Sequence, residues 1–154
     1  MRLVVAVVGK ARNAALGEAI RDYETRAARY WPLDVHEVRE ERAGSAPVDR
    51  VKEREGARLA EKIPDRAQTV LCEPGGRSFD SEGFAHLLKR ARDEDRDLAF
   101  LIGGAFGLAP TLSERSAMRL SLAPWTLPHE IARLVLAEQI YRAGTIVRGE
   151  PYHK

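Results

Sequence analysis

The stretch Leu98-Ala-Phe-Leu-Ile102 is an unbroken apolar run that passes directly into Gly103-Gly104-Ala-Phe-Gly107. A short apolar run without polar alternation is typical of a strand that is buried on both faces of a parallel sheet. The glycines after it indicate a turn whose backbone comes close to another group or adopts a positive φ angle, because glycine has no side chain to prevent either. This stretch therefore predicts a central strand that ends in a binding loop.

The alternation of strand and helix continues on both sides of this stretch. Short apolar runs predict strands over residues 3–8, around Leu33 and Val35, and over residues 69–72, 98–102 and 120–122. Apolar residues at helical spacing predict helices over residues 16–29, 51–63, 81–92, 112–118 and 128–143, with Pro128 in the first turn of the last one. Strands that alternate with helices predict an α/β fold, a mainly parallel sheet with helices on both faces.

Size and composition predict one soluble domain. The chain has 154 residues, of which 44% are hydrophobic and 31% charged, so we expect a single domain over residues 1–154. No apolar run approaches the roughly 18 residues that a membrane span needs, and the run at residues 3–8 is too short for a signal peptide. We therefore expect a cytoplasmic protein without a membrane partner. The single cysteine, Cys72, lies in an apolar run and is expected to be a small core residue.

The net charge and the spacing of metal-ligating residues give little support for nucleic-acid binding over the whole surface or for a metal site. The net charge is +2, so any basic surface for nucleic acid must be local. The histidines are scattered and accompany a single cysteine, which does not match the spacing of zinc ligands. We expect no metal site.

Three predicted strands end in loops rich in glycine or proline, after Cys72, Ile102 and Leu122. Ligands of parallel α/β sheets bind beyond the carboxyl ends of the strands, so these loops form the candidate site. The spacing G-G-x-x-G after the fourth strand does not match the dinucleotide motif G-x-G-x-x-G, which follows the first strand, and the motif G-x-x-x-x-G-K-[ST] is absent.

The predicted helix over residues 128–143 is apolar around most of its circumference. One-sided packing would leave apolar surface in water, which a symmetric homodimer would cover. The alternative is a central helix that its own domain surrounds.

Four motifs follow one another in the second half of the chain, namely Phe100-Leu-Ile-Gly-Gly-Ala-Phe-Gly-Leu108, Ser121-Leu-Ala-Pro-Trp-Thr-Leu-Pro-His129, Arg133-Leu-Val-Leu-Ala-Glu-Gln-Ile-Tyr-Arg-Ala143 and Pro151-Tyr-His-Lys154. In this order they resemble the large-subunit ribosomal RNA methyltransferase H family, and the resemblance covers essentially the whole chain. It implies the SPOUT class, a parallel α/β domain with a C-terminal trefoil knot on which a homodimer is built. One departure is Ala105-Phe106, where the family usually has Pro-Glu.

The resemblance also implies a reaction and a cofactor site. Members of the family transfer a methyl group from S-adenosylmethionine to N3 of a pseudouridine in 23S ribosomal RNA of the large subunit. The expected cofactor-binding residues are Leu71, Gly103, Gly104, Leu122, Ala123, Pro124, Trp125, Thr126 and Leu127. Glycine backbone and apolar walls suit a cofactor that contains an adenine. From the residues alone, the alternatives are that Leu71 is a core residue and that the two glycines form an ordinary tight turn.

On the RNA side, the resemblance points to Arg142, Tyr152 and His153, and also to His129. The N3 proton of pseudouridine must leave, and histidine is the usual base near neutral pH, so we expect His153 to accept it. Tyr152 can stack on or hydrogen-bond a base of the RNA, and Arg142 can hold a phosphate. The alternative is a chain terminus without a function.

Two other classes fit the same pattern of elements. One is a flavodoxin-like mononucleotide-binding domain, with its phosphate loop at residues 9–13. The other is a ribosome-binding module without catalytic activity.

Overall fold

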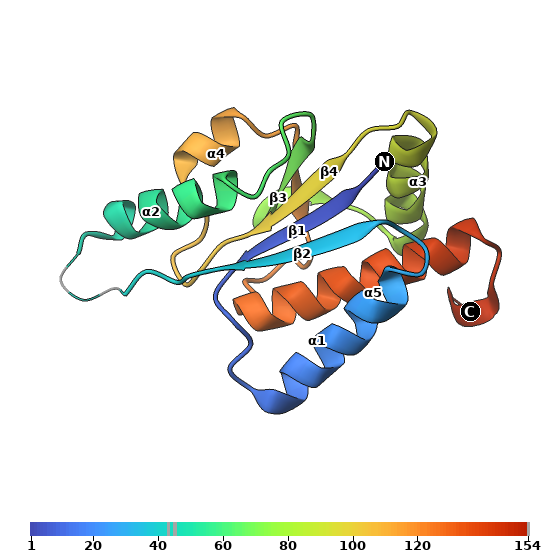
Figure 1. Ribbon diagram of the computed structural model, residues 1–154, viewed down its shortest axis with the longest axis horizontal. Coiled ribbons are helices and arrows are strands. Elements are labelled where there is room, and N and C mark those ends of the chain that lie inside the picture. The colour runs from blue at the N-terminus through green and yellow to red at the C-terminus, as the bar shows by residue number, and fades with distance from the viewer. Residues whose placement is uncertain (43, 45, 154) are drawn as a thin grey trace.

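The computed structural model describes residues 1–42, 44 and 46–153, and of His153 it describes the backbone only. Within these residues, five parallel strands form one sheet in the order β2-β1-β4-β3-β5 (Figure 1). The strands are β1 (Leu3–Val8), β2 (Leu33–Val38), β3 (Gln68–Ser78), β4 (Leu98–Ile102) and β5 (Met118–Ser121). The helices are α1 (Ala14–Ala27), α2 (Val48–Ala60), α3 (Ser81–Asp93), α4 (Pro110–Glu114) and α5 (His129–Val147), and a 3-10 turn, η1 (Pro151–His153), follows them. The predicted α/β fold with a mainly parallel sheet is confirmed.

Helices cover both faces of this sheet (Figure 1), with α1, α3 and α5 on one face and α2 and α4 on the other. The strand β4 lies at the centre, where Phe100 packs into the core beneath α1, α3 and α5 and Leu101 packs into the core beneath α2 and α4. All five residues of β4 are buried. The unbroken apolar run of β4 is therefore the sequence of a strand that serves two cores, because successive side chains point to opposite faces.

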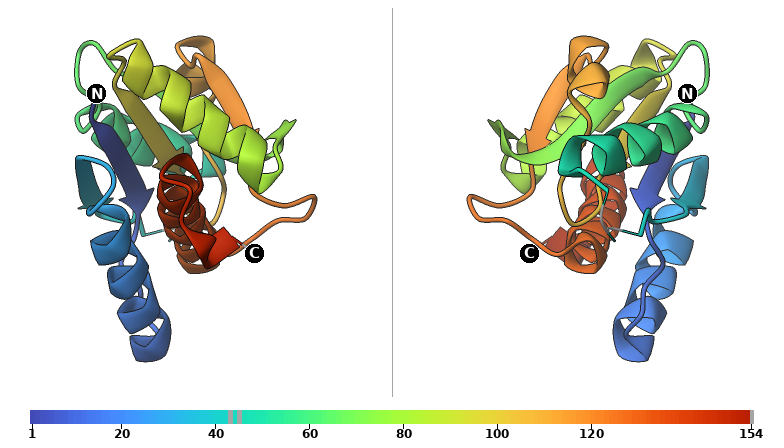
Figure 2. Two further views of the ribbon diagram at one scale, coloured as in Figure 1. Left: turned by 90° about the vertical axis from the view of Figure 1, so that its right-hand side faces the viewer. Right: turned by 90° about the vertical axis from the view of Figure 1, so that its left-hand side faces the viewer.

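The helix α5 packs between α1 and α3 and against the sheet (Figure 2). Leu136 and Ile140 are fully buried there, so the chain itself covers part of the apolar circumference. Ile131, Leu134 and Val135 on the remaining side are half-buried. The homodimer stays a prediction, and this half-buried face is the part of α5 on which it depends.

Three predicted boundaries are wrong. Residues 73–77 are not a loop, because β3 continues to Ser78 after an irregularity between Cys72 and Arg77 and pairs with β5 on both sides of it. The helix expected over 112–118 is the shorter α4, because Met118 already begins β5 and pairs with Val70. Pro128 precedes α5 as an extended N-cap residue with ψ 145° instead of lying in its first turn.

In the described residues, no helix is long and apolar enough to cross a membrane. The single domain over residues 1–154 and the trefoil knot stay predictions.

Candidate cofactor cavity and C-terminal tail

A cavity of about 640 Å³ lies at the carboxyl end of β4 and beside the irregularity in the middle of β3, at Cys72–Pro74, and the segment between β5 and α5 closes one side of it. This is the edge of a parallel sheet at which ligands bind, and the volume is typical of small-molecule sites. Figure 2 shows the segment between β5 and α5 projecting away from the body of the molecule. Seven of the predicted cofactor residues line the cavity, namely Gly103, Gly104, Leu122, Ala123, Trp125, Thr126 and Leu127.

Two predicted cofactor residues are absent from the described cavity wall. Leu71 is fully buried in the core beneath α2 and α4, whereas its neighbour Cys72 lines the cavity. Pro124 is exposed. The roles of Leu71 and Pro124 in cofactor binding stay predictions, and for Leu71 such a role falls to its backbone. Burial raises the pKa of the Cys72 thiol to about 12, so that the thiol stays protonated at neutral pH.

The turn after β4 is too tight for any side chain at position 103. A Cβ atom built on Gly103 would lie 2.7 Å from the carbonyl carbon of Gly107. The expectation of a positive φ in this turn is met at Gly107, with φ 83°, and not at Gly103. The turn closes through the Gly107 N–H, which donates to the carbonyl oxygen of Gly104 at 3.0 Å. Glycine at 103 is therefore explained by the close approach of the turn's own backbone.

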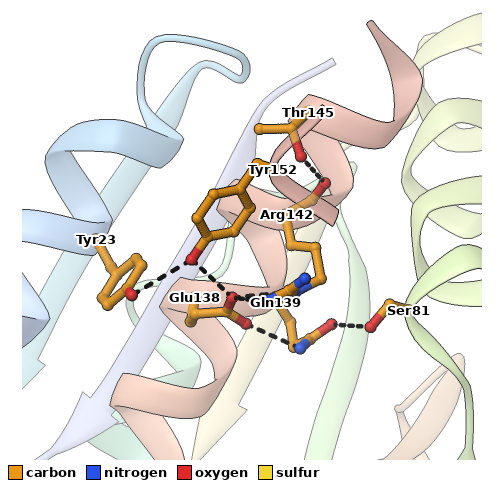
Figure 3. Close-up of polar contacts among 7 residues, drawn as sticks. All are labelled: Tyr23, Ser81, Glu138, Gln139, Arg142, Thr145 and Tyr152. Atoms are coloured by element: carbon orange, nitrogen blue, oxygen red, sulfur yellow. Dashed lines mark hydrogen bonds and ion pairs between the residues drawn. The ribbon is translucent and has the colours of Figure 1, made fainter. Parts of the chain in front are cut away.

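The predicted RNA-side residues Arg142 and Tyr152 meet over Glu138 (Figure 3). The Tyr152 hydroxyl donates to Glu138 Oε1 at 3.1 Å, and Arg142 donates to the same oxygen through Nη2 at 2.6 Å and Nε at 3.0 Å. The Arg142 guanidinium also lies 4.9 Å from the centre of the Tyr152 ring. Desolvation raises the pKa of Tyr152, and the negative charge of Glu138 and the hydrogen bond that Tyr152 donates to it raise this pKa further. This phenol therefore stays protonated and cannot serve as a base.

The structure does not bring Arg142 of α5, or Tyr152 of the C-terminal tail that follows α5, to the cavity of the same chain. Among the described residues that line the cavity, α5 contributes His129 and Ala132 from its first turn. Arg142 lies 13 residues after His129 on the same helix, or roughly 20 Å further along its axis at 1.5 Å per residue. The side chain of His153, the predicted base, lies outside the described residues.

The whole chain matches a known family. Residues 1–153 match the family described as predicted SPOUT methyltransferase. The chain belongs to this SPOUT methyltransferase family. It is 58% identical to the ribosomal RNA large subunit methyltransferase H of Gemmatimonas aurantiaca, with 100% of both chains covered. It is 41% identical to the proteins of the same name from Syntrophotalea carbinolica, with 99% of both covered, and Listeria monocytogenes, with 100% of both covered.

Membership of the SPOUT methyltransferases confirms the family resemblance and makes the protein an enzyme. The flavodoxin-like domain and the ribosome-binding module without catalytic activity are therefore both wrong as accounts of the whole chain. Among the described residues of this methyltransferase, no three His, Cys, Asp or Glu side chains gather in a way that could hold a metal ion.

Sequence reasoning missed two charged residues of the methyltransferase cavity. Lys52 on α2 and Glu73 on β3 both line it, and Glu73 forms an ion pair with Arg119 of β5. Nothing in the sequence around Lys52 distinguishes it from other lysines on helix surfaces. Glu73 stands in the segment that was predicted to be a loop, so its pairing with a neighbouring strand was not expected.

His129, the other residue that the resemblance indicates on the RNA side, lies at the cavity. Its ring packs against the backbone of Gly9, where an added Cβ would lie 3.1 Å from Nε2. Nε2 is buried and has no hydrogen-bond partner among the described residues. His129 therefore lies at the cavity of the methyltransferase, whereas His153 belongs to the C-terminal tail.

A buried carboxyl group lies directly beneath the glycine turn. Glu55 on α2 is 3% exposed, and its Oε1 accepts the backbone N–H of Glu41 at 2.9 Å. Its Oε2 has no partner among the described residues and would lie 2.7 Å from a Cβ built on Gly104. Desolvation raises the pKa of Glu55, the charges of Glu40 and Glu41 raise it further, and the N–H of Glu41 and the charge of Arg58 oppose this shift.

Replacing Glu55 by glutamine should stabilise the methyltransferase at neutral and alkaline pH. Because folding raises the pKa of Glu55 above its ordinary value of 4.5, the folded state binds this proton more tightly than the unfolded chain does. The wild-type protein therefore loses stability as pH rises from about 4.5 through the folded pKa, and Glu55→Gln removes this loss. Thermal unfolding of both proteins between pH 4 and pH 8.5 should show a melting-point gain for the variant that grows with pH.

The control is Glu53→Gln, which changes an exposed carboxylate on the same helix and should leave the pH dependence unchanged. A melting-point difference for Glu55→Gln that stays constant over the whole pH range would contradict the raised pKa.

Proposed function

We propose that this chain is an S-adenosylmethionine-dependent methyltransferase that methylates N3 of a pseudouridine in 23S ribosomal RNA. The observation that carries the proposal is the cavity at the carboxyl end of β4 in a chain whose relatives bear the name ribosomal RNA large subunit methyltransferase H. The cavity supplies what this cofactor requires, because glycine backbone offers hydrogen-bonding groups at close range and leucine side chains offer apolar walls.

The residues present fit the parts of S-adenosylmethionine. Leu108, Leu122 and Leu127 line the cavity and can enclose the adenine. The turn at residues 103–107 lines the cavity, and its backbone groups other than the paired Gly104 carbonyl and Gly107 N–H can contact polar atoms of the cofactor. The ammonium group of Lys52 can pair with the carboxylate of the methionine part. When bound, this cofactor supplies an electrophilic methyl group on its sulfonium.

The chain must also remove the N3 proton of the pseudouridine. Tyr152 is unsuitable because its pKa is raised, and Arg142 is unsuitable because the hydrogen bond to Glu138 raises the pKa of its guanidinium. We propose His153 as the base, with Arg142 as a phosphate contact and Tyr152 as a contact to the RNA. His129 is the second candidate base, because it already lies at the cavity.

The active enzyme is proposed to be a homodimer in the cytoplasm, acting on the large subunit or the assembled ribosome. The separation of roughly 20 Å between the first turn of α5 and Arg142 also indicates which chain supplies the tail to each cavity. A tail cannot act on the cavity of its own chain over that distance along a rigid helix, but it can act on the cavity of a second copy. We therefore propose that each reaction centre combines the cavity of one protomer with the tail of its partner.

Methyl transfer to ribosomes tests the function. The purified protein, labelled S-adenosylmethionine and 70S ribosomes from a strain that lacks the corresponding gene should yield one methylated nucleoside. Mass spectrometry of the 23S RNA should identify it as N3-methylpseudouridine. Label in another nucleoside, or binding of S-adenosylmethionine without transfer to any RNA of the ribosome, would show the proposal to be wrong. Free 23S RNA in parallel defines which form of the substrate is accepted.

Replacing Leu134 by glutamate should give a monomer that lacks methyltransferase activity. Leu134 is half-buried on the side of α5 that its own chain leaves uncovered, and a charge there would be buried without a partner in the dimer. Light scattering after gel filtration measures the mass, and the ribosome assay measures activity. Val48→Glu, at a 47% exposed apolar residue of α2, is the control and should remain dimeric and active. A Leu134→Glu monomer with wild-type turnover would rule out the need for a dimer.

A further inference from the structure

One oxygen atom, Glu138 Oε1, accepts hydrogen bonds from both tail-side residues of the proposed reaction. It receives Arg142 Nη2 at 2.6 Å, Arg142 Nε at 3.0 Å and the Tyr152 hydroxyl at 3.1 Å (Figure 3). Because three N–H and O–H groups converge on one atom, the position of that atom determines where the guanidinium and the phenol lie. Hydrogen bonds to a charged acceptor are also stronger and shorter than neutral ones.

The carboxylate itself is held in place by its own neighbours. Glu138 Oε2 accepts Gln139 Nε2 at 2.9 Å, and Gln139 Oε1 accepts the Ser81 hydroxyl of α3 at 3.0 Å (Figure 3). Since the Tyr152 hydroxyl donates its proton to Glu138, the hydroxyl of Tyr23 on α1 donates to Tyr152 across 3.3 Å. Glu138 therefore connects the tail with α5 and, through Gln139, with α3, whereas Tyr152 itself contacts α1. Both oxygens of Glu138 already have protein partners.

The tail needs such an attachment in order to be ordered. Chain termini fray unless they are tied to the body of the domain. The Tyr152 ring packs on Tyr141 with ring centres 4.6 Å apart, which holds the apolar part of the side chain. The polar end is held by Glu138 and Tyr23, so that loss of the Glu138 oxygen would release the hydroxyl and the guanidinium together.

We propose that Glu138 is a positioning residue for methyl transfer, which holds Arg142 and Tyr152 as one unit and thereby places the tail for the RNA. This inference rests on the proposed function, in which those two residues face the substrate. Glu138 acts through these two residues and does not itself contact the reacting atoms. A misplacement of about 1 Å in such a unit can cost about 100-fold in rate.

The test compares Glu138→Ala with Glu138→Gln in the full-length protein. Glutamine keeps a carbonyl oxygen that can accept from Arg142 and Tyr152, whereas alanine removes the acceptor. We expect kcat on ribosomes to fall by about 100-fold or more for Glu138→Ala and to remain within about tenfold of wild type for Glu138→Gln. Affinity for S-adenosylmethionine, measured by calorimetry, should be unchanged in both. Glu82→Ala, which removes an exposed carboxylate of α3 outside this hydrogen-bond network, is the control and should match wild type.

Hydrogen exchange provides a second measurement that does not depend on activity. The backbone amides of residues 150, 152 and 153 should exchange faster in Glu138→Ala than in the wild type and Glu138→Gln. If Glu138→Ala does not fold, Tyr23→Phe tests the same attachment from α1, because it removes only the hydroxyl that donates to Tyr152. We expect faster exchange of the tail amides and a kcat loss of about 3- to 10-fold in Tyr23→Phe.

Several outcomes would overturn the inference. Wild-type kcat in folded Glu138→Ala would do so, and so would equal losses in the alanine and glutamine variants, because the charge instead of the oxygen would then matter. Unchanged tail exchange in Glu138→Ala, or in Tyr23→Phe where the alanine variant does not fold, would show that Glu138 does not hold the tail. If the wild-type protein itself fails to methylate ribosomes, the proposed function fails, and the exchange measurement still decides whether Glu138 attaches the tail.

Discussion

Replacing Gly103 by alanine should abolish detectable binding of S-adenosylmethionine while the sheet still folds. The added Cβ would lie 2.7 Å from the carbonyl carbon and 2.8 Å from the carbonyl oxygen of Gly107, which is well inside van der Waals contact with backbone that cannot rotate away. The turn must therefore open, and the cavity wall that it forms changes shape. Because β4 ends at Ile102, before the turn, the buried strand and its two cores are unaffected. Valine at 103 should have at least the same effect.

Calorimetric titration with S-adenosylmethionine measures the loss, which we expect to exceed 100-fold in Kd because the turn supplies the backbone contacts of the cofactor. Circular dichroism and thermal unfolding check the fold. Gly75→Ala is the matched control, since a Cβ there would meet only the end of the Arg119 side chain at 3.8 Å. A folded Gly103→Ala protein with wild-type affinity would place the cofactor elsewhere.

The parts of the fold that the sequence predicts well are those whose signal is local. Leu98-Ala-Phe-Leu-Ile102 is apolar at every position because both of its faces are buried, and this shows in the sequence without any knowledge of its neighbours. The second half of β3 is the opposite case. Its residues 73–77 have the composition of a loop, and they are extended because they pair with β5. A Cβ on Gly76 would lie 2.6 Å from the backbone of Leu120, so the glycine that reads as a loop signal is required for a close approach of two strands.

The candidate site likewise has parts that can be predicted from the sequence and parts that cannot. The glycine turn and the segment before α5 could be predicted because they follow parallel strands, whose carboxyl ends converge at one edge. Lys52 and Glu55 could not, because they lie on a helix and only tertiary packing brings that helix to the cavity and the turn. Glu138 did leave a local signal, since it stands four residues before Arg142 on one helix face, a spacing at which opposite charges pair.

Replacing His153 by alanine should lower kcat for ribosome methylation by about 10²- to 10⁴-fold, the range for a positioned acid-base group, and leave affinity for S-adenosylmethionine unchanged. The reason is that the other two predicted RNA-side residues at this end of the chain cannot accept the proton. The raised pKa values of Tyr152 and Arg142 keep both side chains protonated, so that histidine is the group there that can accept the N3 proton near neutral pH. Wild-type kcat should fall below pH of about 6.5 as a histidine base becomes protonated, and this fall should be absent from the residual activity of His153→Ala.

His129→Ala separates the two candidate bases. His129 lines the cavity, so its loss should weaken binding of S-adenosylmethionine, an effect that His153→Ala should not show. Deleting residues 152–154 should cost at least as much kcat as His153→Ala, because it also removes the Tyr152 hydroxyl from Glu138. A truncated enzyme with wild-type turnover would make the tail dispensable and move the role of base to His129.

Mixing two inactive proteins then tests whether tail and cavity act across the dimer. The tail-deleted protein keeps an intact cavity, and Gly103→Ala keeps an intact tail. In a heterodimer of the two, one reaction centre combines the intact cavity of one protomer with the intact tail of its partner, whereas the other centre lacks both. Unfolding and refolding an equal mixture should give about half heterodimers by random pairing, and hence about a quarter of the wild-type activity per protomer pair. If each tail served the cavity of its own chain, every centre in the mixture would lack one component, and no activity would return.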